Sequence, residues 1–592
     1  MARQHGVTRS SRATWLRRGL FGVGALFVLA AGWFAFTALQ AKSELTKVKS
    51  ELSQVRADVK AGDVAAARVS AADVAKHAHA AHMATNGPLW SALAAIPYVG
   101  DPVDTAHGMT VAADELGSTV VPELIDVAGQ VDPSKLRQPG DQFNLSAITG
   151  AAPTIEKMAA QAQAITVSVN QLAGDSWLGP INSARDSLAS ALKSLDGTLG
   201  GLDKIARVAP TMLGQNGTQR YFVTLMNEAD SRGVGGSPDA YAILEADHGV
   251  VKFVHFGASS DFDGVQVDTN LGSDFTQRYR LEDPSGHYSW SNVSPNFPYA
   301  GQIWADMWKK KTGETIDGAI SLDPTALSYL VGVTGKVRAA DGTRITAKNV
   351  LTSTQSDMYT LFPSAAQRAA RTKHQVDIWQ AVDVAIITSK DTKGLLRQFG
   401  VAEGERRLLF WSADPTIESV LATTVGGGVL PQTTAPFVAP VITSRTNSEL
   451  DFYLEPTTTV ARASCGGAYE VTVTMILKSL APGAGLSPDV TVRTDKPPYP
   501  THPGDQRVNA NYFATDGATL VTATLDGKPV TVVQGVERGH PTFQADVEIP
   551  HGQTRTVVLT LKEPKTAGAP IVLTQPTVRP LQLSVTGGTC SN

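Results

Sequence analysis

The chain has 592 residues, of which 42% are hydrophobic and 18% charged, and its formal net charge is −4. This is the composition of folded domains, so disorder is excluded as the main state of the chain. A nucleic-acid-binding protein would need a basic face, and the slightly acidic balance gives no reason to expect one. At roughly 150 residues per domain, the length predicts three or four domains.

The amino end predicts a membrane anchor. Residues 1–18 form a basic tail with five arginines, and residues 19–41 carry no charge. About 20 apolar residues are enough to cross the hydrocarbon core of a bilayer. We therefore predict an uncleaved transmembrane signal anchor over 19–41; the alternative is a cleaved signal peptide, whose apolar core is usually shorter. The short tail and the large domain that follows favour a cytoplasmic amino end and an extracytoplasmic bulk, although basic residues lie on both sides of the span.

Residues 42–75 predict a helical stalk. Apolar residues alternate three and four apart, which is the spacing of a coiled-coil seam: Leu45, Val48, Leu52, Val55 and Val59. Only about two heptads are present, fewer than a convincing coiled coil needs. The seam could form a parallel homodimer or pack on the chain's own next helix.

Residues 76–210 are rich in alanine and predict a helical bundle. An apolar stripe at helical spacing, Leu188, Leu192, Leu195, Leu199 and Leu202, is typical of a core face. A histidine cluster, His77, His79 and His82, begins the segment. Positions two apart do not share a helix face, so a solvated cluster is favoured over a metal site.

Residues 211–430 predict a central α/β domain. Strands are expected over 220–226, 240–245 and 250–256, and the last two are joined by a turn at Asp247-His248-Gly249. A later helix begins with Asp323 as N-cap and Pro324 at the first helical position. Strands that alternate with helices are typical of the α/β class.

Three runs in this domain carry a family resemblance: "RYFVTLMNEADSRGVGGSPDAYAILEADHGVVKF", "WSNVSPNFPYAGQIWADMW" and "DGAISLDPTALSYLVGVTGKV". They resemble the 4012 domain-of-unknown-function family, whose members are bacterial envelope proteins with one amino-terminal membrane helix. Further runs extend the resemblance through most of the chain: "PLWSALAAIPYVGDP", "NSELDFYL" and "HPGDQRVNANYF". The resemblance implies a single-pass, extracytoplasmic protein of the cell envelope, and it implies no activity.

The central domain is also distantly similar to the LytR-CpsA-Psr phosphotransferases, which attach polymers to the cell wall from polyprenyl-phosphate carriers. This likeness rests on the strand that ends at Asp230-Ser231-Arg232, the hairpin that follows and the run "IDGAISLDPTALSYLVGVTGKV". Those enzymes have a charged Pro-Arg-Asp-Thr motif after the hairpin, where this chain has Gly257-Ala258-Ser259-Ser260. The likeness implies a related fold without the charged motif. We therefore name no catalytic residue and favour a protein that is not an enzyme.

The glycine-rich loop after the first strand is the strongest site candidate. Glycines let backbone N–H groups approach an anion, and an arginine can add a bidentate contact. The candidate anion- or ligand-binding residues are Asn227, Arg232, Gly233, Gly235, Gly236 and Ser237. The alternative is a sharp turn between two strands, with Arg232 paired to Glu228 or Asp230.

Three weaker patterns follow the loop. Asp261 and Asp263 are a weak candidate for a hard cation, and a solvated acidic loop is the alternative. His255, Ser259, Ser260 and Asp261 have the residue types of a hydrolase triad, but neighbours on a strand point to opposite faces. An aromatic cluster could stack on sugars or lipid, or else form core: Tyr288, Trp290, Phe297, Tyr299, Trp304 and Trp308. None of these patterns identifies a cofactor.

Residues 439–592 change to short alternating strands with Gly, Pro and Asp turns, which predicts a β-sandwich. Its Cys465 and Cys590 are the two cysteines of the chain. In an exported domain this pair predicts a disulfide, with two buried thiols as the alternative.

Three hypotheses for function follow. The first is an envelope protein that binds a cell-wall glycan, a lipid-linked anion or, through the sandwich, a protein partner. The second is an active transferase or pyrophosphohydrolase on polyprenyl-linked glycan. The third is a structural spacer that sets a distance from the membrane.

Overall fold

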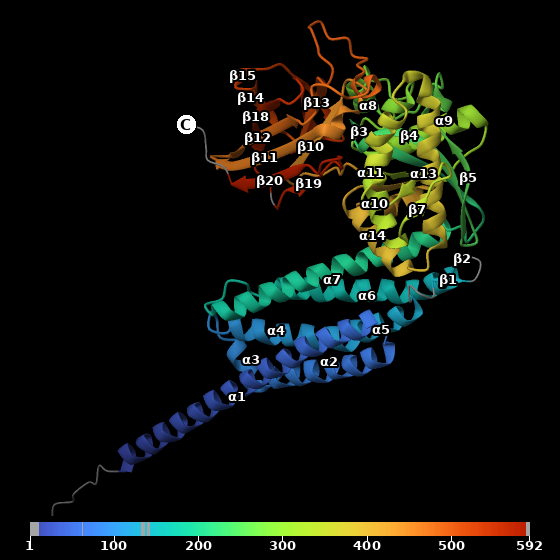
Figure 1. Cartoon of the computed structure of the whole chain (residues 1–592). Helices are drawn as coiled ribbons and strands as arrows, with labels where there is room; N and C mark the ends of the chain where they lie inside the picture. Colours follow the sequence, from blue (N-terminus) through green and yellow to red (C-terminus); the bar gives the residue numbers. More distant parts are fainter. Residues whose placement is uncertain (1–10, 62, 132–135, 139–141, 567, 588–592) are drawn as a thin grey trace, which may run out of the picture. The chain divides into compact units, whose positions relative to one another are not determined.

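The computed structural model describes the chain except residues 1–10, 62, 132–135, 139–141, 567 and 588–592 (Figure 1). The chain divides into two compact units. Unit 1 comprises Met1–Leu136 and Asn144–Pro210, and unit 2 comprises Arg137–Phe143 and Thr211–Asn592. An amino-terminal helical region is followed by mixed sheets with helices and then by carboxy-terminal strands.

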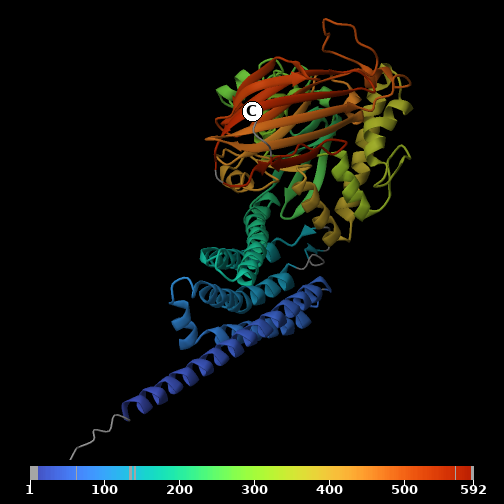
Figure 2. The ribbon, with the colours of Figure 1, turned by 90° about the vertical axis from the view of Figure 1, so that its left-hand side faces the viewer.

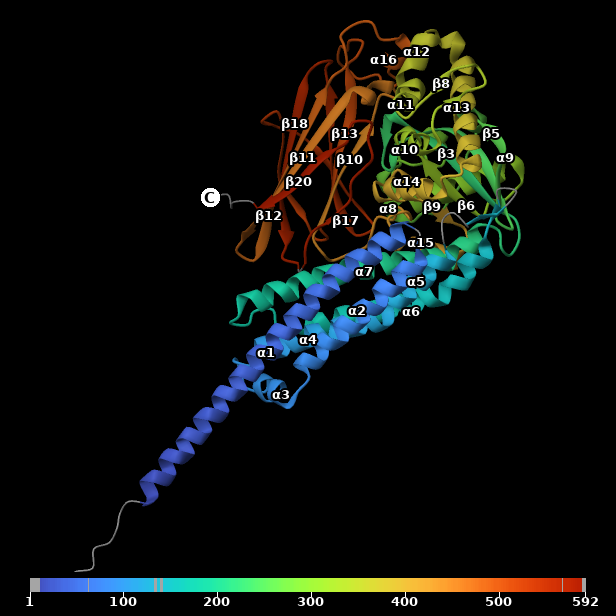
Figure 3. The same cartoon turned by 60° about the horizontal axis from the view of Figure 1, so that its bottom comes forward.

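Unit 1 is a helical bundle whose helices α2, α4, α5 and α6 run alongside one another (Figure 3). Its helices are α1 (Ser11–Ala61), α2 (Val64–Thr85), α3 (Pro88–Ala94), α4 (Asp101–Glu115), α5 (Val121–Gln130), α6 (Leu145–Gln171) and α7 (Gly179–Met212). The carboxylate of Asp63 caps α2 by accepting from the Ala66 N–H, and Asn144 caps α6 in the same way. Short polar side chains therefore define where these helices begin.

The predicted stalk packs within its own chain. Val48 and Val55 of α1 are buried in one cluster with Ala67, Ala71 and Val74 of α2. Small alanine side chains let the two helices approach closely. The apolar seam of α1 therefore packs on the chain's own next helix, which was the alternative to a parallel homodimer.

The predicted anchor over 19–41 lies within α1, whose side chains are described only from Leu29 onward. The part of the span before Leu29 therefore lies outside the described side chains. Among the residues that were described, no helix is both long enough and apolar enough to cross a bilayer.

The histidine cluster of α2 binds carboxylates. His79 and His82 both share a hydrogen bond with Asp114, at 3.2 and 2.7 Å, and His77 lies 2.5 Å from Glu44. In the described part of the chain, no group of three or more His, Cys, Asp or Glu is arranged to hold a metal ion.

The first half of unit 2 is built on a five-stranded mixed sheet of order β5-β4-β3-β6-β9. The strands are β3 (Gln219–Arg232), β4 (Gly235–Asp247), β5 (Val250–Gly257), β6 (Gly318–Leu322) and β9 (Leu408–Ser412). Within this sheet, only β3 and β6 pair in parallel. One face packs on α9 (Phe297–Thr312), and the other packs on α10 (Pro324–Thr334), α13 (Arg368–Thr388) and α14 (Thr392–Gly404).

Alternation along β3 divides its side chains between the two faces of the sheet. Phe222 enters the cluster that holds Phe297, Trp304 and Trp308, whereas Val223 enters the cluster on the opposite face. Tyr288 is buried in the same cluster as Phe222. Most of the aromatic residues between 288 and 308 are therefore core, which was the alternative to a binding surface.

The second half of unit 2 consists of two facing sheets. The first has the order β16-β17-β13-β10-β19 and contains β10 (Phe437–Ser444), β13 (Gln506–Ala514), β16 (Val532–Glu537), β17 (His540–Ile549) and β19 (Ile571–Val572). The second has the order β15-β14-β18-β12-β11-β20 and contains β11 (Leu454–Cys465), β12 (Ala468–Ser479), β14 (Thr519–Leu525), β15 (Lys528–Pro529), β18 (Thr554–Pro564) and β20 (Gln582–Gly587). Alternate apolar residues of both sheets form the core between them.

The sheet of β10 is the inner one, because it lies beside the α/β half at β3 and at α8 (Ser273–Arg278) (Figure 1). The guanidinium of Arg278 donates to Thr542 Oγ1 at 2.6 Å and to Asn511 Oδ1 at 2.9 Å, and both acceptors are on that sheet. The sheet of β11 and β12 is therefore the outer one. Cys590, one half of the predicted disulfide, lies outside the described residues.

Shorter elements complete the chain: β1 (Arg137–Gln138), β2 (Gln142–Phe143), β7 (Val337–Arg338), β8 (Arg344–Ile345), α11 (Val350–Thr352), α12 (Met358–Leu361), α15 (Pro415–Leu421) and α16 (Pro488–Thr491).

Candidate functional site

The glycine-rich loop is the tip of the β3–β4 hairpin, and its glycines allow close backbone contacts. A Cβ at Gly236 would lie 2.0 Å from the Asn227 carbonyl oxygen, and one at Gly233 would lie 2.3 Å from the Val293 carbonyl oxygen. Neither position has room for a side chain. The ladder is irregular between Asn227 and Ser231, so residues 228–230 leave regular pairing with β4. The glycines are therefore explained by packing.

Arg232 is fully buried, with 0% of its surface exposed. A guanidinium has five N–H donors, and here each one is bonded. Two donate to the carboxylate of Asp230 at 2.8 and 2.9 Å. The others donate to the carbonyl oxygens of Ser289 and Ser231 and to Asn447 Oδ1, at 2.9 to 3.1 Å. The same group stacks on the Trp290 ring, 3.9 Å from its centroid.

Arg232 is therefore paired with Asp230, which was the alternative to binding an anionic ligand. No N–H of its guanidinium is left for a ligand. The backbone around it is also covered, because the Gln575 side chain donates to the Arg232 carbonyl oxygen. Asn227, Ser237 and the three candidate glycines lie at the same tip, and all of them are buried.

Carboxylates from the sandwich half cover the tip. The short helix η6 (Glu449–Tyr453) places Glu449 Oε2 2.8 Å from Asn227 Nδ2. Asp451 accepts from the Ser231 N–H at 2.9 Å and from Gln506 Nε2 at 2.6 Å. Burial, with the nearby charge of Asp230, raises the pKa of Glu449 to about 8, and burial raises the pKa of Asp451 to about 6. Part of the acidic charge at the tip is therefore neutralised by protons near neutral pH.

A second buried ion cluster lies beside the tip. Arg407 Nη1 donates to Glu228 at 2.6 Å and to Asp323 at 2.7 Å, and Nη2 donates to the Thr577 carbonyl oxygen at 3.0 Å. Asp323 also caps α10 by accepting from the Ala326 N–H. Burial and the neighbouring Glu228 charge raise the pKa of the Asp323 carboxyl. The sequence showed the cap, but nothing in it indicated Arg407 as the partner.

Asp239, on β4 near the tip, is half-buried. It accepts a hydrogen bond from Gln375 Nε2 at 3.0 Å, and burial raises its pKa. Ser259 and Arg368 interact with the same carboxylate. A carboxyl with a raised pKa is suited to proton transfer, and no pattern in the sequence pointed to Asp239.

The weak metal candidate gains no support from the structure. Asp261 accepts from the Tyr241 hydroxyl at 3.0 Å and from the Ala258 N–H at 3.1 Å. These contacts hold the loop after β5, and in the described part of the chain neither Asp261 nor Asp263 belongs to a group of three or more His, Cys, Asp or Glu that could hold a metal ion.

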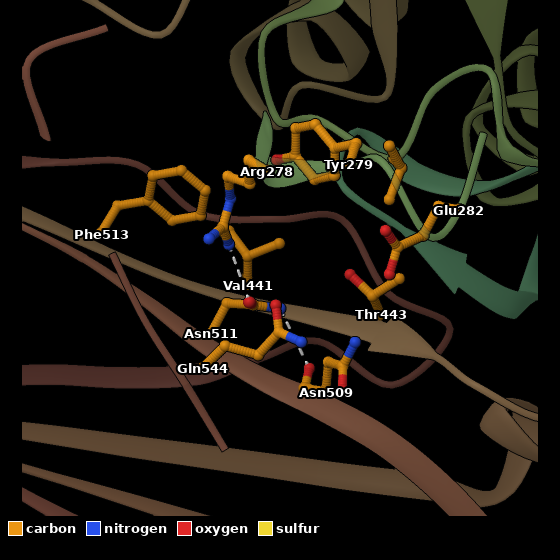
Figure 4. Close-up of a pocket in the computed structure, with 10 residues that line it drawn as sticks. Arg278, Tyr279, Glu282, Val441, Thr443, Asn509, Asn511, Phe513 and Gln544 are labelled. Atoms are coloured by element: carbon orange, nitrogen blue, oxygen red, sulfur yellow. Dashed lines mark hydrogen bonds between the residues drawn. The ribbon is translucent and has the colours of Figure 1, made fainter. Parts of the chain in front are cut away.

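Two pockets in unit 2 also lack the features of a ligand-binding site. The one in Figure 4, between α8 and the inner sheet, measures about 10 Å³, which is room for about one water molecule. The other measures about 670 Å³ and is open and polar. Both cations in its lining are already paired, because Glu245 lies 2.9 Å from Arg220 and 3.1 Å from Lys252.

The outer sheet carries a second candidate surface. Side chains on β11, β12 and β18 alternate between the two faces of the sheet. Val460, Val473 and Leu559 are buried in the core, so the residues directly before and after each of them point away from the core. We call these outward residues and their neighbours the threonine face: Thr457, Thr459, Thr472, Thr474, Thr522, Thr524, Thr556, Thr560, Ser584 and Thr586. The ladder registers place Thr459 beside Thr474, and Thr560 beside both Thr472 and Thr522.

The threonine face is uncharged. Its side chains form three rows that run across the strands, and Gln582, Ala461, Ile476 and Val558 fill the remaining positions of these rows. Charged residues begin only at the rims of the face, with Lys478 at one end and Lys562 at the other. Solvated protein surfaces normally intersperse charges of both signs. In Figures 1 and 2 the described elements of unit 2 leave the outer side of this sheet uncovered. Hydroxyl and methyl groups on a flat surface can bond to, and pack against, polyhydroxylated molecules.

The comparisons with known proteins bear on the central region. No curated protein and no solved structure matches the chain. Residues 216–359 match the family described as "Protein of unknown function (DUF4012)". The match includes the hairpin tip and confirms the family that the sequence predicted, whereas the distant likeness to the LytR-CpsA-Psr enzymes gains no support from it. This match assigns residues 216–359 to the DUF4012 family.

Proposed function

We propose that this protein is a membrane-anchored binding protein of the cell envelope, and that the threonine face of its sandwich binds a neutral glycan. The observation that carries the proposal is the uncharged, uncovered surface of three rows on the outer sheet. Threonine is common in strands for its shape alone. The absence of charge from three adjacent rows is the feature that points to a hydroxyl-rich ligand.

The hairpin tip supports binding over catalysis. A phosphotransferase needs cations that can reach a pyrophosphate, and Arg232 is fully buried with all five N–H groups bonded. To reach a phosphate, Arg232 would have to break its ion pair with Asp230. A buried ion pair that loses one partner leaves an uncompensated charge, which is strongly unfavourable.

The sequence supports the envelope location. The uncharged segment 19–41 favours one anchor, and the short tail 1–18 with the large domain that follows favours a cytoplasmic amino end and an extracytoplasmic bulk. The ladder of β11 and β20 supports the disulfide, because it pairs residues 125 positions apart, such as Thr457 with Gln582, and Cys465 and Cys590 have the same separation. Disulfides persist in oxidising compartments.

The test is glycan binding by the full chain in detergent, with insoluble cell-wall polysaccharide and soluble neutral oligosaccharides as probes. Thr474→Glu places a charge in the centre of the threonine face, and we expect binding to fall at least about tenfold. The matched control is Thr554→Glu, on the same sheet beside the charged rim at Lys478, which should bind within about twofold of the parent. Equal binding by both variants, or none by the parent protein, would contradict the proposal.

A transferase on polyprenyl-linked glycan is the second candidate, and Asp239 is the observation that favours it. The residue is half-buried, burial raises the pKa of its carboxyl, and Arg368 nearby is exposed. Such a carboxyl could accept a proton from an attacking hydroxyl. The test is release of phosphate from a polyprenyl pyrophosphate with a divalent metal present. Turnover that Asp239→Asn abolishes would support this candidate, and no turnover in the parent protein would remove it.

A further inference from the structure

Three uncharged segments meet at one end of unit 1. They are residues 19–41 of α1, residues 86–100 around α3, and residues 176–184 before and at the start of α7. Trp90 Nε1 donates to Thr37 Oγ1 at 3.0 Å, and the Trp90 ring lies 4.7 Å from that of Phe34. Trp177 Nε1 donates to the Val99 carbonyl oxygen at 3.4 Å. Contacts therefore join the three segments into one surface.

Large apolar side chains are exposed on that surface. We call the group Ile96, Tyr98, Val99, Trp177 and Leu178 the bundle tip. Tyr98 is 70% exposed and Trp177 is 51% exposed. Exposed apolar residues of this size, when they are contiguous, mark an interaction surface.

Tyr98 adds a backbone argument. Its φ is 67°, a left-handed conformation that is costly for a residue with a Cβ. The turn is held by the Gly100 N–H, which donates to the Ile96 carbonyl oxygen at 2.7 Å. Because the ring that this turn carries is mostly exposed, contacts within the unit do not explain the strain.

The anchor helix leaves the unit at the bundle tip. Phe34 and Thr37 of α1 contact Trp90, whereas the side chains of Leu29, Trp33, Phe36 and Leu39 are exposed. From Thr37 back to Leu29 is about 12 Å along a helix, at 1.5 Å per residue. The apolar helix therefore extends beyond the bundle tip by this distance and continues through uncharged sequence. A bilayer beside the bundle tip best accommodates such a helix.

We propose that the bundle tip inserts into the boundary between headgroups and acyl chains beside the anchor, so that unit 1 rests on the membrane surface. Tyrosine and tryptophan are suited to this boundary because each has an apolar ring and a polar atom. The inference rests on the proposed anchor and is independent of the threonine face. The tip segments contain no Lys or Arg, so the contact should not require anionic lipid.

The test uses the full chain in phosphatidylcholine vesicles, with a photoreactive phenylalanine analogue at residue 98 or at residue 177. The matched control is the same analogue at Ile205, which is 57% exposed on α7. It lies about 39 Å along the helix from Gly179 at the tip end. We expect lipid adducts at 98 and 177 at least about five times more abundant than at 205, with similar yields at low and high salt.

Vesicle flotation separates this inference from the anchor. Protein that floats with the vesicles but gives no lipid adducts at 98 and 177 above the level at 205 would overturn the bundle-tip proposal and leave the anchor standing. Adducts between two copies of the chain at these positions would overturn it in favour of a dimer. Protein that does not float would overturn both.

Discussion

The hairpin tip and the threonine face are both polar regions of unit 2, and they differ in charge and in exposure. At the tip, Arg232 is fully buried and bonded to Asp230, and the Glu449 and Asp451 carboxyls lie over it. On the face, the outward side chains are uncharged and partly or fully exposed. The charged, glycine-rich run therefore serves the fold, and the candidate ligand surface is the uncharged threonine face.

The tip shows what buried charge does in this molecule. Its hydrogen bonds run from β3 to Asn447, Glu449, Asp451 and Gln575, which lie more than 200 positions away along the chain. These bonds join the α/β half to the sandwich half. Each carboxylate has a donor and Arg232 has no free N–H, so an error in docking the halves would leave a buried charge unpaired.

Arg232→Ala should cause the largest loss of stability. Removing the guanidinium leaves Asp230 buried without its partner, which costs about 3–5 kcal/mol. Urea unfolding followed by tryptophan fluorescence measures the loss. The control is Arg555→Ala, a partly exposed pair with Asp526, which should cost less than about 1 kcal/mol. Equal costs for the two variants would mean that the tip is not a buried ion pair.

The disulfide should rank second. Intact mass under non-reducing conditions should show Cys465 joined to Cys590, and replacing both by serine should lower the free energy of unfolding by about 2–4 kcal/mol. The bond would cross-link the β11–β20 edge of the threonine face without adding charge to it. Two free thiols in protein isolated from the envelope would contradict the prediction.

The protonation of Glu449 gives a smaller, pH-dependent effect. Its pKa in the folded protein is raised to about 8 from a usual value of 4.5. The folded state therefore binds more protons than the unfolded state between these values, so its contribution is complete below pH 4.5 and is lost as pH rises toward 8. Glu449→Gln should raise Tm at pH 9 relative to the parent and change Tm little at pH 5. An equal change at both pH values would show that the carboxyl is not protonated in the fold.

Substitutions on the threonine face should have the smallest effect on stability. Thr472→Ser and Thr560→Ser remove only methyl groups that face outward, so unfolding should change by less than about 0.5 kcal/mol each. If either variant lost more than about 2 kcal/mol, the face would be a buried interface. Compared with Arg232→Ala, these variants show how much more unfolding free energy depends on the hairpin tip than on the threonine face.

The sequence by itself determined the local structure. Period-two alternation indicated the sandwich strands, the Asp247-His248-Gly249 turn gave the β4–β5 hairpin, and Asp323 with Pro324 gave the start of α10. Hydrogen bonds and steric rules within a few residues decide each of these features. The family was also evident from the sequence, because the matched residues are contiguous.

Only the tertiary structure decided whether a polar residue would serve a ligand or the fold. The Arg232–Asp230 pair is local, but its burial depends on Asn447 and Gln575, which no nearby sequence indicates. The threonine face likewise exists only once five strands are placed in register. Solvent access is set by segments that fold over one another from far along the chain, and solvent access decides whether a charge is free to bind or must be paired.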